Sequence, residues 1–216
     1  AGRMLVWARL AAGLGARLEE ILRQLADLAE RQAETPMAGR SYGQLATPTS
    51  FGALVASWGG PLLRLRADLD QLRPGFCVSL SGAAGTLSAM GPKGPELRTA
   101  LAEALGLADP GGSWHAERDR ITSLAGCLTQ ITTSLGKIGE DLSRMAQSEI
   151  GEVTLGQSGS SSTMPQKQNP VQPQVLVALA RMAPAVNAAI QGAGLHAQNR
   201  DGAAWITEWL SLPQLC

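Results

Sequence analysis

The chain has 216 residues, which is long enough for one large domain or two small ones. Its 18 basic and 18 acidic side chains balance, so no charge excess favours nucleic acid or an anionic membrane as a partner. The three cysteines lack metal-ligand spacing and fit a reduced, cytoplasmic protein. We see no signal peptide and no uninterrupted apolar run as long as a membrane span, which favours a soluble protein.

The first part of the chain predicts two long helices. Strand signals are weak, because aromatic residues and β-branched runs are scarce. The first helix covers 1–33 and ends before Pro36 and Gly39, and a loop follows through about Pro48. A second helix covers about 49–72. Apolar residues three and four positions apart give the first helix one continuous stripe: Met4, Trp7, Ala11, Leu14, Leu18, Ile21, Leu25 and Leu28.

The middle of the chain predicts small-residue turns, a short helix and then a long one. The turn "SGAAGT" at 81–86 precedes a helix over about 95–106, and "DPGGS" at 109–113 ends that part. The long helix, over 121–145, has the apolar residues Ile121, Leu124, Leu128, Ile131, Leu135, Ile138, Leu142 and Met145. Their spacing alternates between three and four, which indicates core packing in an all-α helical bundle.

A polar loop over 151–169 leads into another helix. Asn169 is predicted to cap this helix, with Pro170 at its first position, where the missing N–H of proline costs nothing. Pro184 should kink or end the helix. A last helical segment covers about 199–211.

The stretch "SGSSSTMPQKQNPVQPQ" at 158–174 spans the end of this loop and the start of the helix. Long loops in compact domains are often functional or disordered. The free N–H groups and positive dipole of a helix N-terminus attract carboxylates, and Lys167 adds a positive charge. Asn169 and the serines add neutral donors. Composition alone suits a flexible linker equally well.

The order of the residues favours the carboxylate site. "SSTMPQKQNP" resembles the signature loop of the fumarase/aspartase superfamily, Gly-Ser-Ser-x-Met-Pro-x-Lys-x-Asn-Pro. The positions that match in register are Ser161, Ser162, Met164, Pro165, Lys167, Asn169 and Pro170. Ser160 stands where the family has glycine, so the loop is expected to be stiffer.

A second region carries the same resemblance. "ETPMAGRSYGQLATPTSFG" at 34–52 is similar to the family pattern Gly-Arg-Thr-His-x-Gln-x-Ala, with Ser41 for threonine and Tyr42 for histidine. Stretches at 82–91, 114–120, 135–142, 147–153 and 204–213 resemble one branch, the bacterial 3-carboxy-cis,cis-muconate cycloisomerases. A bulky aromatic often replaces the histidine in that branch, so Tyr42 supports the resemblance.

The resemblance implies an enzyme of protocatechuate breakdown, the β-ketoadipate pathway, that converts 3-carboxy-cis,cis-muconate to 4-carboxymuconolactone. Superfamily members act through an aci-carboxylate intermediate, and the loop serine is the acid/base at carbon. By register this residue is Ser161, whose alkoxide the helix end and Lys167 would favour. Lys167 and Asn169 would hold the activated carboxylate.

The resemblance also implies that further residues contact a tricarboxylate substrate and that the reaction needs no metal or cofactor. Gln44 and Ser41 would contact another carboxylate, and Tyr42 would shape the pocket. Arg40 either contacts substrate or ties the loop to backbone carbonyls. The implied substrate-binding set is Lys167, Asn169, Gln44, Ser41, Arg40, Tyr42, Ser162 and Met164.

Other polar and aromatic residues have plainer interpretations. His115 precedes a helix and is expected to pack or cap it, and His196 is expected to be exposed. Glu140 and Asp141 should face solvent or a neighbouring helix. Trp205 and Trp209 lie four residues apart, which is typical of core or subunit packing.

The resemblance also bears on extent and assembly. The chain is expected to be a fragment, a central helical-bundle domain over 1–216 that lacks most of the N- and C-terminal domains and is inactive alone. Family members are homotetramers with active sites shared among subunits. Two other functions stay open: an adenylosuccinate- or argininosuccinate-type lyase, or a non-catalytic paralogue. The lyases normally keep the histidine that Tyr42 replaces, whereas Ser160, Gln166 and Gln168 favour the paralogue.

Overall fold

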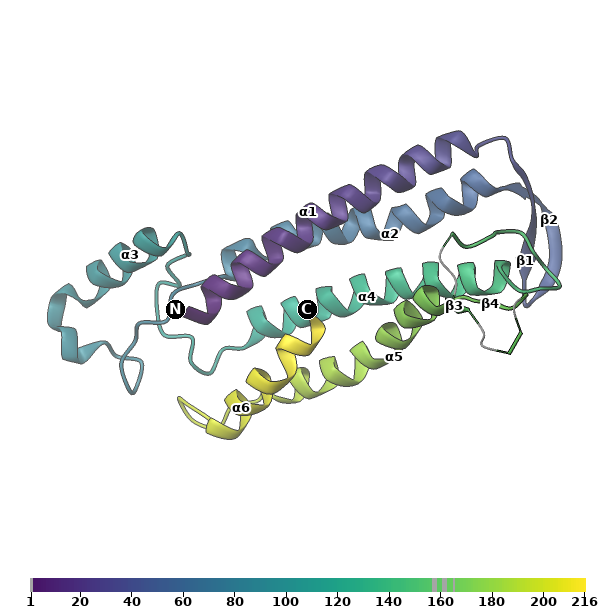
Figure 1. The fold of residues 1–216 in the computed structure, drawn as a ribbon. Coiled ribbons are helices and arrows are strands. Elements are labelled where there is room, and N and C mark those ends of the chain that lie inside the picture. Colours follow the sequence, from purple (N-terminus) through teal and green to yellow (C-terminus); the bar gives the residue numbers. More distant parts are fainter. Residues whose placement is uncertain (1, 157–158, 161–162, 165) are drawn as a thin grey trace. The chain divides into compact units, whose positions relative to one another are not determined.

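The computed structural model describes residues 2–156, 159–160, 163–164 and 166–216, and long helices dominate them (Figure 1). This confirms the predicted all-α class. The helices are α1 (Gly2–Arg31), α2 (Phe51–Gln71), α3 (Gly94–Leu105), α4 (Asp119–Met145), α5 (Val171–Gly192) and α6 (Gly202–Ser211). Short 3-10 helices lie at η1 (Arg73–Gly75), η2 (Ser88–Lys93) and η3 (Leu212–Leu215).

Contacts along the chain divide it into two compact units. Unit 1 comprises Ala1–Arg17, Arg66–Leu128 and Ala185–Cys216, and unit 2 comprises Leu18–Leu65 and Thr129–Pro184. The helices α1, α2, α4 and α5 each contribute residues to both units. Both stretches that resemble the family signature regions belong to unit 2.

The loop predicted between the first two helices is a β-hairpin, so that prediction is wrong. Strand β1 (Pro36–Ser41) pairs antiparallel with β2 (Gln44–Ser50), and the register shifts between Ala38 and Arg40. Most side chains of the hairpin are exposed on both faces, so its sequence lacks the apolar alternation that predicts a strand. Gly39 permits the pairing, because an added Cβ would lie 2.5 Å from the Thr47 carbonyl oxygen.

The predicted apolar stripe of α4 lies in the core. Its members in unit 1 are buried, and in unit 2 both Ile131 and Met145 are buried while the other three members, Leu135, Ile138 and Leu142, are partly exposed. The α1 stripe has the same character, with Leu18 almost fully buried. The spacing therefore predicted the packed faces of both helices.

A second face of α4 consists of small residues and docks α5 in unit 2. A Cβ added at Gly136 would lie 2.2 Å from the Ala180 Cβ, and one at Gly139 would lie 2.5 Å from the Pro173 carbonyl oxygen. The two backbones can approach this closely only because neither glycine has a side chain. This contact fixes the N-terminal half of α5, which directly follows the signature loop.

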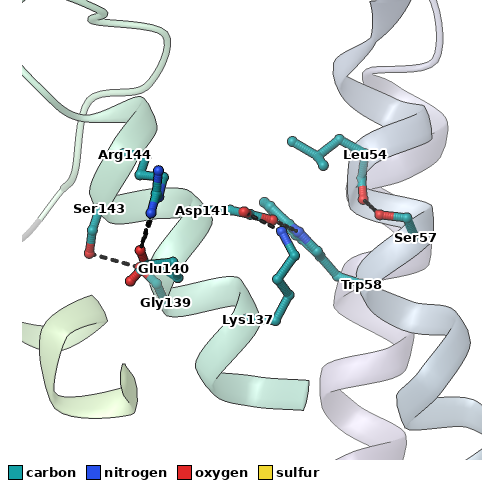
Figure 2. Close-up of polar contacts among 9 residues, drawn as sticks. All are labelled: Leu54, Ser57, Trp58, Lys137, Gly139, Glu140, Asp141, Ser143 and Arg144. Atoms are coloured by element: carbon teal, nitrogen blue, oxygen red, sulfur yellow. Dashed lines mark hydrogen bonds and ion pairs between the residues drawn. The ribbon is translucent and has the colours of Figure 1, made fainter. Parts of the chain in front are cut away.

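Polar contacts join α4 to α2 in the same unit. Asp141 points from α4 toward α2 and accepts a hydrogen bond of 2.8 Å from the buried Trp58 indole (Figure 2). Lys137, one turn earlier, pairs with the same carboxylate, and Arg144 pairs with Glu140. Asp141 thus faces a neighbouring helix, as predicted, and satisfies the only polar group of the buried Trp58 side chain.

Helix α5 begins at Val171 instead of Pro170, and it continues past Pro184 to Gly192. Of the two effects predicted for Pro184, ending the helix is wrong, and a kink stays a prediction. Proline removes one hydrogen bond of the ladder without ending the helix here. By length and composition α5 could also cross a membrane, with mean hydropathy 1.3, but one such helix is weak support for a membrane span.

Candidate functional site

The signature loop is closed by its own small sheet. Strand β3 (Gly159–Ser160) pairs antiparallel with β4 (Gln168–Asn169), so Gly159 lies opposite Asn169 and Ser160 opposite Gln168. The loop predicted over 151–169 is therefore a hairpin in its second half. An added Cβ at Gly159 would lie 2.5 Å from the Val171 Cγ2, so glycine lets this hairpin rest against the start of α5.

The described part of the loop presents polar groups to solvent next to a helix end. Lys167 and Met164 are exposed, and the Lys167 amide donates to the Met164 carbonyl at 3.0 Å in a tight turn. Asn169 is half-buried and lies two residues before α5. The first N–H groups of α5 and the Lys167 ammonium together favour an anion here. Ser161 and Ser162 lie outside the described residues.

The start of α5 is held in place by side chains. The Pro170 carbonyl accepts from the Gln174 amide at 3.0 Å, which makes Pro170 the residue that leads into the helix. Asn169 therefore stands one position before its predicted place as the cap. The Gln174 side chain donates to Ser143 of α4 at 2.9 Å. Ser143 in turn donates to the Gly139 carbonyl at 2.8 Å (Figure 2).

The tip of the β1–β2 hairpin brings three of the predicted residues together. Tyr42 and Gly43 form its turn with φ of 52° and 73°, and Ser41 pairs with Gln44 across it. Positive φ at both central residues is what the I′ hairpin turn requires. Tyr42 is fully exposed at 103%, so its ring and hydroxyl contact nothing in the described chain. A bulky residue in this conformation is strained, and strain of this kind concentrates at functional sites.

An ion pair links this hairpin to the segment after α4. The Arg40 Nη2 lies 2.7 Å from the Glu152 Oε1, and both side chains are partly buried. Arg40 was predicted either to contact substrate or to bind backbone carbonyls; its observed partner is the Glu152 carboxylate, and the substrate contact stays a prediction. Glu152 was not singled out from the sequence. The residue before it, Gly151, has φ of 58°, a conformation that favours glycine.

The predicted site residues therefore form two groups within unit 2. Ser41, Tyr42 and Gln44 share the hairpin tip, whereas Met164, Lys167 and Asn169 share the signature loop. Across the described ranges, no group of three or more His, Cys, Asp or Glu side chains could hold a metal ion. The donors on both groups are those that bind carboxylates: hydroxyl, amide and ammonium.

Both histidines lie in unit 1, away from the signature loop in sequence. His115 is 6% exposed and packs edge-on against Trp205 at 5.9 Å, which confirms its predicted packing role. His196 was expected to be exposed, and this is wrong, because both ring nitrogens are buried without a hydrogen-bond partner in the described chain. Burial, with Arg118 nearby, lowers the pKa of His196.

Trp205 and Trp209 hold α6 in unit 1. Their rings lie 5.6 Å apart, and the Arg3 guanidinium of α1 lies 3.3 Å from the Trp209 ring centroid. Arg118 and Glu208 form a buried ion pair between the start of α4 and α6. These contacts give both tryptophans a packing role within the chain, as predicted.

Comparison with known proteins identifies the family. The model of the lyase family matches residues 1–184. The chain is 42% identical to 3-carboxy-cis,cis-muconate cycloisomerase of Pseudomonas aeruginosa, covering 100% of this chain and 48% of that protein. It is 40% identical to the enzyme of the same name from Pseudomonas putida, covering 92% of this chain and 49% of the relative.

A solved structure agrees. The crystal structure of 3-carboxy-cis,cis-muconate lactonizing enzyme from Pseudomonas putida superposes with a TM-score of 0.92 at 35% identity, covering 100% of this chain and 48% of that one. The chain spans about half the length of the curated relatives it matches. The chain belongs to the lyase family and, with it, to the fumarase/aspartase superfamily.

Proposed function

We propose that the protein is a cycloisomerase that converts 3-carboxy-cis,cis-muconate to 4-carboxymuconolactone in protocatechuate breakdown, the β-ketoadipate pathway. The observation that carries the proposal is the ion pair that links the two stretches resembling the family's signature regions. Residues far apart in the sequence, Arg40 and Glu152, join the hairpin to the segment that leads into the signature loop. The names of the relatives above support the choice of substrate.

The proposed reaction needs carboxylate holders and one proton carrier. A carboxylate oxygen of the substrate attacks a carbon of the diene and forms the C–O bond of the lactone. The electron pair moves onto the neighbouring carbon and its carboxylate, which gives an aci-carboxylate. Ser161 then delivers its hydroxyl proton to that carbon, and no group leaves. The serine alkoxide takes a proton from water before the next turnover. Lys167, Asn169 and the first N–H groups of α5 stabilise the growing negative charge of the activated carboxylate.

The hairpin group takes a different part of the substrate. Ser41 and Gln44 face each other across the turn and offer neutral donors to a second carboxylate. Tyr42 stands between them in sequence and limits the shape of the pocket. Ser162 and Met164 complete the loop side, where the exposed Met164 thioether offers an adaptable apolar contact. Arg40 acts through Glu152 to hold the hairpin.

The protein is proposed to act as a cytoplasmic homotetramer whose active sites are shared among subunits. Support comes from α5, where an exposed apolar stripe follows one face of the helix at spacings of four, four and three. Its members are Val171, Val175, Leu179 and Met182, each about half exposed. A monomer that exposes such a stripe on a long helix gains stability by covering it. The proposed tetramer is tested by the mass of the protein in light scattering.

One assay tests the activity. The full-length protein is incubated with 3-carboxy-cis,cis-muconate, and loss of the diene absorbance is followed, with adenylosuccinate and argininosuccinate in parallel. We expect loss of the diene and no cleavage of either succinate adduct. Cleavage of an adduct without lactonization would overturn the proposal in favour of a β-eliminating lyase. Turnover of none of the three would favour a non-catalytic paralogue. A domain made of residues 1–216 alone is proposed to be inactive.

A further inference from the structure

Unit 1 contains a cavity that neither the signature loop nor the hairpin contributes to. Its volume is about 220 Å³, and it is lined by residues of α1, the end of α2, η1 and three loop positions. A cavity of about 150 Å³ is enough to bind benzene. The space here therefore accommodates a single ring with one small substituent.

The cavity exists because one face of α1 has almost no side chains. Ala8, Ala11, Ala12 and Gly15 line it at helical spacing, so four successive positions on this face present at most a methyl group. Across from them, Leu69 and Phe76 are buried and form an apolar wall. A flat apolar body can lie between the methyl groups and this wall.

Three charged side chains line the cavity, Arg66, Asp70 and Arg73, and their net charge is positive. Arg66 is held in place, because its Nε donates to the Gly15 carbonyl at 3.2 Å and its guanidinium pairs with Asp70. Gly15 allows this approach, since an added Cβ would lie 3.2 Å from the Arg66 Nε. Arg73 also lines the cavity, and in the described part of the chain its guanidinium has no hydrogen bond or ion pair.

We propose that this cavity binds a small aromatic carboxylate, with the carboxylate on Arg73 and the ring against the alanine face of α1. The guanidinium fork matches a carboxylate with two parallel N–H···O bonds, which a single ammonium cannot do. Arg66 is already paired with Asp70, so its charge is compensated and Arg73 is left to bind the anion. The proposal does not rest on the activity proposed above.

The test uses benzoate as the probe and benzyl alcohol as its uncharged counterpart. The full-length protein is labelled with ¹³C at alanine methyl groups, and the signals of Ala8, Ala11 and Ala12 are followed during each titration. We expect saturable shifts of these signals with benzoate and much weaker ones with benzyl alcohol. Shifts at other alanines, such as Ala46 of the hairpin, without shifts here would overturn the proposal.

Matched variants sharpen the result. Arg73→Gln should raise the dissociation constant about tenfold or more, because it removes a charge-assisted bidentate contact. Arg73 and Arg64 are both exposed, but Arg64, on α2, does not line the cavity, so Arg64→Gln should change the dissociation constant less than about twofold. Ala11→Leu fills the cavity and should abolish the shifts at Ala8. Equal binding by the Arg73 and Arg64 variants, or unchanged binding by the Ala11 variant, would contradict the site.

Discussion

Arg40 of β1 and Glu152 after α4 form an ion pair of 2.7 Å that joins the hairpin to the segment leading into the signature loop. The two residues are 112 positions apart in the chain. We propose that the pair gives Arg40 a positioning role, in which it orients the hairpin tip. This role makes a prediction that differs from that of a substrate-binding arginine.

We expect Glu152→Gln to lower kcat/KM as much as Arg40→Gln does, and the double variant to be no worse than either. Stability should fall by less than about 1 kcal/mol, because both side chains are partly exposed. Steady-state kinetics and thermal unfolding of the full-length variants measure both effects. Arg144→Gln, which removes a surface pair with Glu140, is the control and should leave kcat/KM unchanged. If Glu152→Gln leaves kcat/KM unchanged while Arg40→Gln raises KM, Arg40 binds substrate.

Ser161→Ala should lower kcat for lactonization by about 10²–10⁴-fold, the usual contribution of a positioned acid or base. The diene absorbance assay measures the rate, and circular dichroism checks that helicity is intact. Ser158→Ala changes the same residue type three positions earlier in the sequence and should keep most of the activity. Equal losses in both variants, or no loss in the first, would remove Ser161 from its role.

Gly136→Ala should destabilise the protein by about 1–3 kcal/mol, because the new methyl group would overlap the Ala180 Cβ of α5. Gly126→Ala is the control on the same helix, where an added Cβ meets nothing within 4 Å. That change should stabilise α4 by up to about 1 kcal/mol through helix propensity. Urea unfolding of both variants gives the two free energies. A Gly136→Ala protein as stable as the Gly126→Ala protein would contradict the close α4–α5 contact.

Tyr42→Asn should hold or raise the unfolding temperature while it lowers kcat/KM. Asparagine adopts positive φ more readily than tyrosine, so the strain at the turn is reduced while the exposed ring is lost. Tyr42→Phe keeps the ring and should retain activity if the residue acts by shape. Thermal unfolding and substrate kinetics separate the two contributions. A Tyr42→Asn protein with normal kinetics would show that the tip does not contact substrate.

Asp109 predicts a pH dependence of stability in unit 1. Hydrogen bonds from Arg98 at 2.5 Å, Thr99 at 2.6 Å and the Gly111 amide at 2.9 Å lower the pKa of its carboxyl to about 2. A lowered folded-state pKa stabilises the fold above the ordinary pKa of 3.8, and this is lost as the pH falls toward 2.

The Asp109→Asn variant should therefore unfold at a lower temperature than the parent at pH 6. The difference should shrink between about pH 4 and pH 2, where the parent loses the same charge. Asp119→Asn, an aspartate with no such set of donors at the start of α4, serves as the control. A difference that stays constant from pH 6 to pH 2 would contradict the lowered pKa.

The sequence predicted the long helices well because their signal is local. The spacing of apolar residues in α4 reports which face is buried, whatever lies against it. The β1–β2 hairpin was not predicted, for two reasons. Its strands are mostly exposed on both faces, and its turn has tyrosine at a position where asparagine or glycine is the usual signal of a hairpin turn. The two-residue strands β3 and β4 are too short to carry any periodic pattern.

For the site, the candidate residues came from matching the sequence to a known motif, because periodicity and composition do not single them out. Lys167 and Asn169 lie beside the start of α5, as predicted, and Asn169 stands one position before its predicted place as the cap. Glu152 and the glycine face of α4 were missed, because their importance depends on partners that the chain brings in from elsewhere. His196 was misjudged for the same reason, since its burial comes from unit 1 as a whole.

The β3–β4 pairing has a consequence for how members of this family can diverge. Gly159 and Asn169 pair at the base of the signature loop. We therefore expect a change of sequence in the segment between them to leave this pairing in place. Helices α4 and α5 would keep their register, which Gly136 and Gly139 set independently. We therefore expect that the stretch from Gly159 to Asn169 can be replaced by the corresponding segment of a relative while α4 and α5 keep their packing.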